Sequence, residues 1–164
     1  MNRPATLLVL LLAGLLAGCG GGSRPTGIRA AETPADDVAE YQPRWRSHTV
    51  DSTQYRKVFL AGTIDMGRSS DWQAALVARF RDSIGGRWLF FNPRRREFHA
   101  SPAEMEYQVA WELAHLEAAD LIVMNLLGDS RSPISLLEMG LYARSGKLFV
   151  ACSPDYYRYD NVRI

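Results

Sequence analysis

The sequence predicts an α/β domain with a doubly wound parallel sheet of four to five strands flanked by helices. Short apolar runs alternate along the chain with longer segments in which apolar residues recur every three or four positions. Buried parallel strands joined by amphipathic helices have this pattern. The length of 164 residues, with 47% hydrophobic and 23% charged residues, suits a single globular core.

The first 18 residues are typical of a secretory signal peptide and are not expected to belong to this domain. They contain one cation, Arg3, then an apolar run over 5–16 and a small-residue exit that ends at Cys19. The run is shorter than the roughly 20 apolar residues that span a bilayer. Residues 16–19 resemble the lipobox of bacterial lipoproteins, in which the cysteine is lipidated. We therefore expect a lipoprotein held on a lipid bilayer through Cys19, outside the cytoplasmic membrane. An uncleaved anchor helix and a misassigned start codon are the alternatives.

Residues 19–56 are expected to form a flexible tether, and residues 57–164 the folded domain. Gly, Ser, Pro, Thr and charged residues dominate the tether, and no apolar periodicity runs through it. Trp45 and Tyr55 are able to pack on the domain, so the boundary is soft.

The first half of the domain predicts a strand, a helix and a second strand. The apolar run 57–61 stops at a glycine, as a short buried strand does. Residues 70–83 predict an amphipathic helix capped by Ser70 or Asp71. Its apolar residues at helical spacing are Trp72, Leu76, Val77 and Phe80. The run 88–91 predicts the next strand, which Asn-Pro ends.

The second half continues the alternation. Residues 101–119 predict a helix with proline in its first turn. One apolar face of this helix carries Met105, Val109, Leu113 and Leu116. A strand over 120–127, a helix over 132–146 and a strand over 147–152 follow. Rossmann-like and flavodoxin-like sheets are built in this way, and they bind ligands beyond the carboxyl ends of their strands.

Two glutamates are candidates for catalysis. Glu138 lies at helical spacing from four apolar or aromatic residues, namely Ile134, Leu137, Leu141 and Tyr142. This spacing places its carboxylate on or beside the inward face of the helix, where an unpaired charge is costly. Glu112 lies in the preceding helix, between Val109 and Leu116. In a close carboxylate pair, one group is able to act as nucleophile while the other protonates or orients the substrate. A structural ion pair for Glu138 and a solvated helix edge for Glu112 are the alternatives.

Residues at the strand ends complete the candidate substrate site. Gly62 and Asp65 lie in the loop that follows the first strand. Ser132 lies at a helix N-terminus, which suits an anion or a sugar hydroxyl. Arg94 is the first of three consecutive cations after the second strand and is able to meet a phosphate or carboxylate. The simpler interpretations are a turn residue for Asp65, a plain N-cap for Ser132 and a solvated basic loop for Arg94.

Composition excludes several classes of protein. With 19 Lys and Arg against 18 Asp and Glu, the chain is nearly neutral, so we expect no polymeric nucleic acid as a partner. Two cysteines and three histidines form neither a disulfide framework nor a zinc signature, so no metal is expected. The loop 62–67 lacks the glycine fingerprint of dinucleotide binding, and no cofactor is expected.

Taken together, these segments resemble the nucleoside 2-deoxyribosyltransferase-like family. The resemblance spans about residues 58–164 and is carried by 58–67 with 71–73, 92–95, 108–112 with 119–120, and 132–141. It implies that Glu138 attacks C1′ of a deoxyribose, after which a second base or water takes the sugar from the covalent ester. It also implies that Glu112 assists the departing base, Asp65 borders the base or sugar, and Ser132 contacts the 5′ side.

The resemblance therefore predicts transfer or hydrolysis of the N-glycosidic bond of nucleosides or nucleotides through a glycosyl-glutamate intermediate. A lipoprotein that binds a nucleoside or nucleotide without turning it over is the alternative. A surface interaction lipoprotein with a vestigial pocket is a third interpretation. Association of identical chains is left open.

Overall fold

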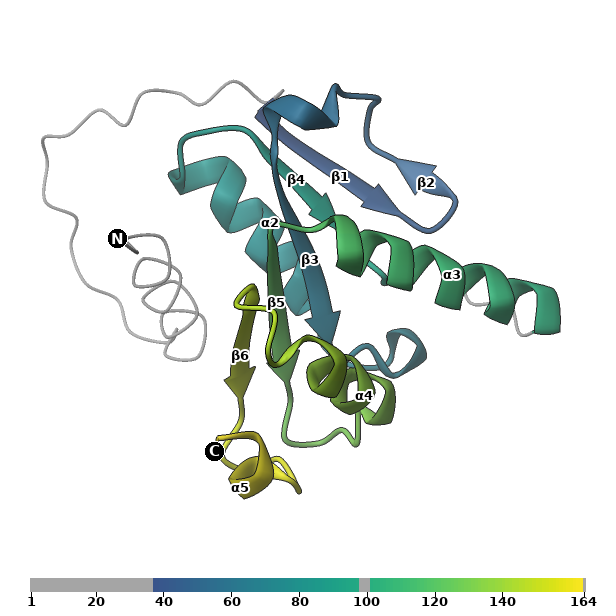
Figure 1. The fold of residues 1–164 in the computed structure, drawn as a ribbon, viewed down its shortest axis with the longest axis vertical. Helices are drawn as coiled ribbons and strands as arrows, with labels where there is room; N and C mark the ends of the chain where they lie inside the picture. The colour runs from purple at the N-terminus through teal and green to yellow at the C-terminus, as the bar shows by residue number, and fades with distance from the viewer. Residues whose placement is uncertain (1–36, 98–100, 164) are drawn as a thin grey trace, which may run out of the picture. The chain divides into compact units, whose positions relative to one another are not determined.

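A six-stranded sheet with the order β2-β1-β4-β3-β5-β6 forms the centre of the fold (Figure 1). The computed structural model describes residues 37–97 and 101–163, so the predicted signal peptide and Cys19 lie outside the described residues. The strands are β1 (Val38–Gln42), β2 (Trp45–Arg46), β3 (Arg56–Gly62), β4 (Trp88–Phe91), β5 (Leu121–Leu126) and β6 (Leu148–Cys152). The α-helices are α2 (Trp72–Ser83), α3 (Pro102–Ala118), α4 (Pro133–Tyr142) and α5 (Tyr159–Val162), and two 3₁₀ turns are η2 (Ser52–Gln54) and η3 (Asp65–Gly67).

The topology confirms the predicted doubly wound α/β fold. Neighbouring strands are parallel except for β1 and β2. From β3 the chain passes through α2 to β4 on one side, then through α3 to β5 on the other side of β3. The strand order therefore reverses between β3 and β5, where Gly62 is opposite Asn125. A ligand site is expected beyond this edge of the sheet.

The helices cover opposite faces of the sheet. Phe80 of α2 packs edge-on against Phe90, with ring centroids 5.1 Å apart. The neighbouring residue on β4, Phe91, faces the other way and packs against His115 of α3. Side chains alternate between the two faces along a strand, so α2 and α3 lie on different faces. Figure 1 shows α3 and α4 in front of the sheet and α2 behind it.

The sheet is larger than predicted because it begins inside the segment that we assigned to the tether. β1 pairs in parallel with β4, and its Val38 and Ala39 are buried. The sequence does not reveal this strand because it is short, follows Asp37 and contains Glu40, so no apolar run marks it. Residues 37–56 therefore belong to the domain, and the sheet has six strands rather than four to five.

The helices begin where the sequence predicts, but two of them expose apolar residues that were expected to be buried. Asp71 caps α2 by accepting a hydrogen bond from Ala74, and Ser101 caps α3 through Glu104. α4 ends at Tyr142, four residues earlier than expected. Most of the apolar residues expected to share a buried face on α3 and α4 are exposed: Met105, Val109, Leu113, Ile134, Leu137 and Leu141. Apolar periodicity marks a stripe on a helix but does not say which neighbour covers it. Among the described residues, no helix combines the length and the apolar character needed to cross a membrane.

Candidate active site

A cavity of about 370 Å³ opens beyond the carboxyl end of β3, as the topology predicts. Its walls come from the loops after β3 and β4, from α3 and from the first turns of α4. We call it the carboxylate cavity because Glu112 and Glu138 both line it. The two helices therefore bring the two predicted catalytic side chains to one site, and most of the remaining lining is apolar.

Glu138 is the more deeply buried of the two carboxyl groups. It is 9% exposed and lies one turn after buried Ser135 on the inner side of α4. No described residue donates a hydrogen bond to its carboxylate. Desolvation raises the pKa of Glu138 to about 8, and the charge of nearby Glu112 adds to the increase. At neutral pH, Glu138 therefore holds a proton in most molecules.

Glu112 is held by a chain of hydrogen bonds across α3. Gln108 Nε2 donates to Glu112 Oε1 at 2.6 Å, and Arg95 Nε donates to Gln108 Oε1 at 2.5 Å. Desolvation raises the pKa of Glu112, while the Gln108 hydrogen bond and the Arg95 charge act in the opposite direction. The anion of Glu112 is thus stabilised by a hydrogen bond and a nearby positive charge, whereas the anion of Glu138 is not. The two groups are therefore suited to share one proton.

A chain of hydroxyl groups borders the carboxylate cavity. Ser132 Oγ lies 2.7 Å from Thr63 Oγ1 and 2.8 Å from Ser130 Oγ, and Ser130 donates to Asp65 Oδ1 at 2.9 Å. The simpler interpretation, in which the side chain of Ser132 caps α4, is wrong. Its backbone is left-handed at φ 40°, and its hydroxyl makes no capping bond. The hydroxyl is instead committed to the link between the loop after β3 and the start of α4.

Backbone strain is concentrated beside the same cavity. Asp65, Met66 and Ser132 have positive φ angles of 49°, 53° and 40°, and all three line the cavity. Left-handed backbone is costly for residues other than glycine, and it persists where the surroundings impose it, often at functional sites. Predicted site residues Gly62, Asp65 and Ser132 therefore lie together with the two glutamates.

Arg94 does not line the carboxylate cavity. Its guanidinium is buried and donates to Ser69, Ser70 and Gln73, and it lies 3.5 Å from the carboxylate of Asp71. These bonds fix the start of α2, which is a structural role. The next cation, Arg95, reaches the cavity instead. Sequence alone does not choose between adjacent arginines, because which one points inward depends on how the loop turns.

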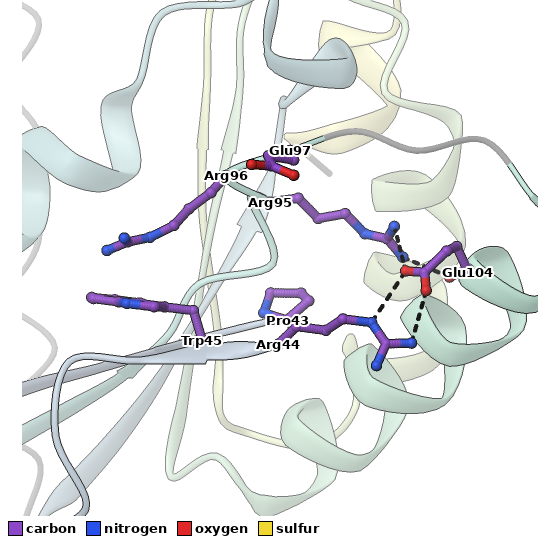
Figure 2. A pocket seen from close by; sticks show the side chains of 7 residues that line it. All are labelled: Pro43, Arg44, Trp45, Arg95, Arg96, Glu97 and Glu104. Carbon is purple, nitrogen blue, oxygen red and sulfur yellow. Dashed lines mark hydrogen bonds and ion pairs between the residues drawn. The ribbon is translucent and has the colours of Figure 1, made fainter.

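A second, smaller hollow lies on the other side of Arg95. It has a volume of about 250 Å³ and is lined by Pro43, Arg44, Trp45, Arg95, Arg96, Glu97 and Glu104. Figure 2 shows Arg44 and Arg95 converging on Glu104, at 2.8 and 3.2 Å. Figure 2 also shows Arg96 beside Trp45, with its guanidinium carbon 3.4 Å from the ring centre. These contacts hold Arg95 between the hollow and the carboxylate cavity.

Gln108, Arg95, Thr63 and Ser130 are the site residues that sequence analysis did not propose. Gln108 had a usable signal, because it precedes Glu112 by four residues and such pairs meet on one face of a helix. Thr63 and Ser130 had none, since their contacts join distant parts of the chain. Among the described residues, no group of acidic, histidine or cysteine side chains could hold a metal ion.

Comparison with known proteins identifies one family. The family model described as nucleoside 2-deoxyribosyltransferase like matches residues 55–156, which is more than half of the chain. The matched range contains every residue that lines the carboxylate cavity. No curated protein matches the sequence.

Proposed function

Because this chain belongs to the nucleoside 2-deoxyribosyltransferase-like family, we propose that it breaks the N-glycosidic bond of nucleosides or nucleotides. Membership of the family supports a nucleoside-related function. The proposal adds the reaction, in which the sugar passes from its base to a second base or to water.

The juxtaposition of Glu112 and Glu138 in one apolar cavity carries this proposal. Cavities of a few hundred Å³ with few polar groups are typical of small-molecule sites. Two carboxyl groups that share one proton in such a cavity match the acid and nucleophile needed for covalent glycosyl transfer, with the proton on Glu112 when Glu138 attacks. The strained backbone and fixed hydroxyl groups beside them suit a preorganised site.

The proposed reaction proceeds in two displacements. A carboxylate oxygen of Glu138 forms a bond to the anomeric carbon while the C–N bond breaks, and the bonding electrons leave with the base. The proton shared by the pair lies on Glu112 at this point and passes to the base. Water or a second base then attacks the anomeric carbon, which releases the Glu138 carboxylate, and the attacking group returns a proton to Glu112.

The other cavity residues are assigned binding roles in this scheme. Asp65 borders the base or sugar, and the Ser132 region at the start of α4 faces the 5′ side. Gly62 lets β3 and β5 approach each other closely at the edge of the cavity, and Arg95 orients Glu112 through Gln108. The scheme uses no cofactor.

The test of this function is release of free base. The purified full chain is incubated with deoxyribonucleosides and their 5′-monophosphates, with and without a second base, and the products are separated by chromatography. We expect free base or an exchanged nucleoside, and a protein mass increased by one pentosyl group after rapid acid quenching. Tight binding of these compounds without any base release would overturn the proposal and favour the non-catalytic binding lipoprotein.

We also propose that the domain is anchored to a bilayer, outside the cytoplasmic membrane, through a lipid on Cys19. The signal-like residues 1–18 and the lipobox-like residues 16–19 support this. In a bacterial host supplied with labelled palmitate, the full chain is expected to take up label and sediment with membranes. The Cys19→Ser variant is expected to do neither. Membrane association that persists without label would indicate an uncleaved anchor helix instead.

A further inference from the structure

The side-chain amide of Gln108 has an orientation that two of its partners fix by their chemistry. Arg95 Nε lies 2.5 Å from Gln108 Oε1, and a guanidinium only donates hydrogen bonds. Gln108 Nε2 lies 3.1 Å from the backbone oxygen of Pro93, which only accepts them. Rotating the amide by half a turn would place two donors together and two acceptors together. The amide therefore turns its nitrogen, and not its oxygen, toward its third partner, Glu112.

Arg95 is itself held in one orientation, so the direction of the amide is set from outside the carboxylate cavity. The Arg95 side chain is 11% exposed. Its Nη1 donates to Glu104 Oε2 at 3.2 Å, and its Nη2 donates to the backbone oxygen of Glu104 at 2.6 Å (Figure 2). With Nε committed to Gln108, all three guanidinium nitrogens have acceptors, and a planar group bound in this way has no second orientation of similar energy.

The fixed amide distinguishes between the two carboxylate oxygens of Glu112. Gln108 Nε2 donates to Glu112 Oε1 at 2.6 Å. In a protonated carboxyl group the carbonyl oxygen is the better acceptor, so this bond favours a proton on the other oxygen, Oε2. Within residues 37–97 and 101–163, no group forms a hydrogen bond with Oε2. Because Glu112 lines the carboxylate cavity, Oε2 is available to a bound molecule.

We propose that Gln108 is a positioning residue that keeps the proton of Glu112 on Oε2, from which the proton passes to the departing base. This inference deepens the proposed function and rests on it for the reaction. As the C–N bond breaks, its electrons move to the base, the base takes the proton from Oε2, and Glu112 is left as a carboxylate. Hydrogen bonds to a charged acceptor are stronger than those to a neutral one, so the Gln108 bond strengthens during this step.

The test compares two substrates that differ in their need for this proton. The base of deoxyguanosine leaves as an anion unless it is protonated, whereas 7-methyl-2′-deoxyguanosine is already cationic and its base leaves as a neutral molecule. Gln108→Glu keeps an acceptor for Arg95 but places a second acceptor against Oε1, which draws the proton of Glu112 to that side. We expect kcat for deoxyguanosine to fall at least about 10-fold, and kcat for the methylated substrate to change by less than about threefold.

Gln42→Glu is the matched control for this substitution. Gln42 also accepts a hydrogen bond from an arginine, Arg96, but it does not line the carboxylate cavity. Neither substrate should be processed more slowly by this variant. A purely structural role for Gln108 would slow both substrates alike in Gln108→Glu. Equal losses for the two substrates, or no loss for either, would therefore overturn the proposal.

Neutron diffraction tests the position of the proton without any reaction. Crystals of the full natural chain are exchanged into heavy water at about pH 4, which is below the raised pKa of Glu112. We expect the deuteron of Glu112 on Oε2, and the deuterons of the Gln108 amide directed at Pro93 and at Oε1. A deuteron on Oε1, or an amide oxygen turned toward Glu112, would overturn the proposal. If neither substrate releases base, the proposed function and the proton transfer fail together, and the neutron result decides separately whether Gln108 sets the position of the proton.

Discussion

Replacing Glu138 by glutamine is expected to remove base release almost completely while the protein stays folded. Glutamine has nearly the same shape, but its amide is unable to form the glycosyl ester or to share a proton with Glu112. Loss of a group that acts covalently typically costs several orders of magnitude, so kcat/KM should fall at least about 10³-fold. Steady-state release of base, measured at pH 7, provides the comparison.

The same variant is expected to be more stable than the natural protein above neutral pH. The pKa of Glu138 rises from its ordinary value of 4.5 in the unfolded chain to about 8 in the folded protein. Between these values the folded state holds a proton that the unfolded state has released. The free energy of unfolding therefore falls as the pH rises from about 4.5 to about 8, and the favourable contribution of neutral Glu138 is complete only below this window. Glutamine does not ionise, so the free energy of unfolding of the variant does not fall in this way.

Urea unfolding at pH 5 and pH 8 measures the effect. Between these two conditions, the stability of Glu138→Gln relative to the natural protein should increase by on the order of 3 kcal/mol. His115, whose pKa burial lowers, titrates with the opposite effect in both proteins, so its contribution cancels from the comparison. Asp82→Asn, an exposed acid-to-amide change on α2, is the control and should alter neither activity nor pH dependence. An active Glu138→Gln, or one whose relative stability does not change with pH, would contradict the burial and role assigned to Glu138.

The shared proton should determine how the rate of the natural protein depends on pH. If the pair must hold one proton to protonate the departing base, kcat/KM falls above about pH 8, where the last proton leaves the free protein. A rate that continues to rise through this pH would show instead that ionisation of Glu138 is the only requirement.

Sequence analysis succeeded for elements whose residues are apolar because they are buried on both sides. β3, β4 and β5 are such strands, and their alternation with helices was sufficient to predict the parallel sheet. β1 was missed because it owes its place to pairing with β4 rather than to a strong local preference. Strand formation depends on the neighbouring strands as much as on the segment itself.

At the candidate site, too, the sequence predicted that a residue is buried but not how its helix or loop is oriented. Glu138 is buried as predicted, but not because its apolar neighbours face inward: Ile134, Leu137 and Leu141 face out, and α4 turns Ser135 and Glu138 toward the sheet. Periodicity detects a two-sided helix without showing which side is inside. Periodicity also does not show that Arg95 rather than Arg94 reaches the cavity, because this depends on contacts between segments that are distant in sequence.

Gly62→Ala is expected to destabilise the fold strongly, because β3 and β5 meet at this residue with no room for a side chain. A Cβ on Gly62 would lie 2.2 Å from the backbone oxygen of Asn125 and 2.6 Å from its nitrogen. Both atoms belong to the backbone of β5 and cannot move aside as a flexible side chain would. The φ of Gly62 is +120°, which residues with a Cβ rarely adopt. Steric displacement and backbone strain together should cost about 3 to 5 kcal/mol.

The damage should extend to the carboxylate cavity, because the next residue connects the strand end to the site. Thr63 donates its backbone N–H to Asn125 and shares a hydroxyl hydrogen bond with Ser132. If alanine pushes β3 away from β5, this connection loosens, and base release should fall even where the variant remains folded. Urea unfolding gives the stability, with Gly85→Ala as the matched control, since Gly85 has open space and an ordinary φ. The control should stay within about 0.5 kcal/mol of the natural protein. Equal stability of Gly62→Ala and Gly85→Ala would mean that β3 and β5 do not approach so closely. That result would contradict the geometry described for the site.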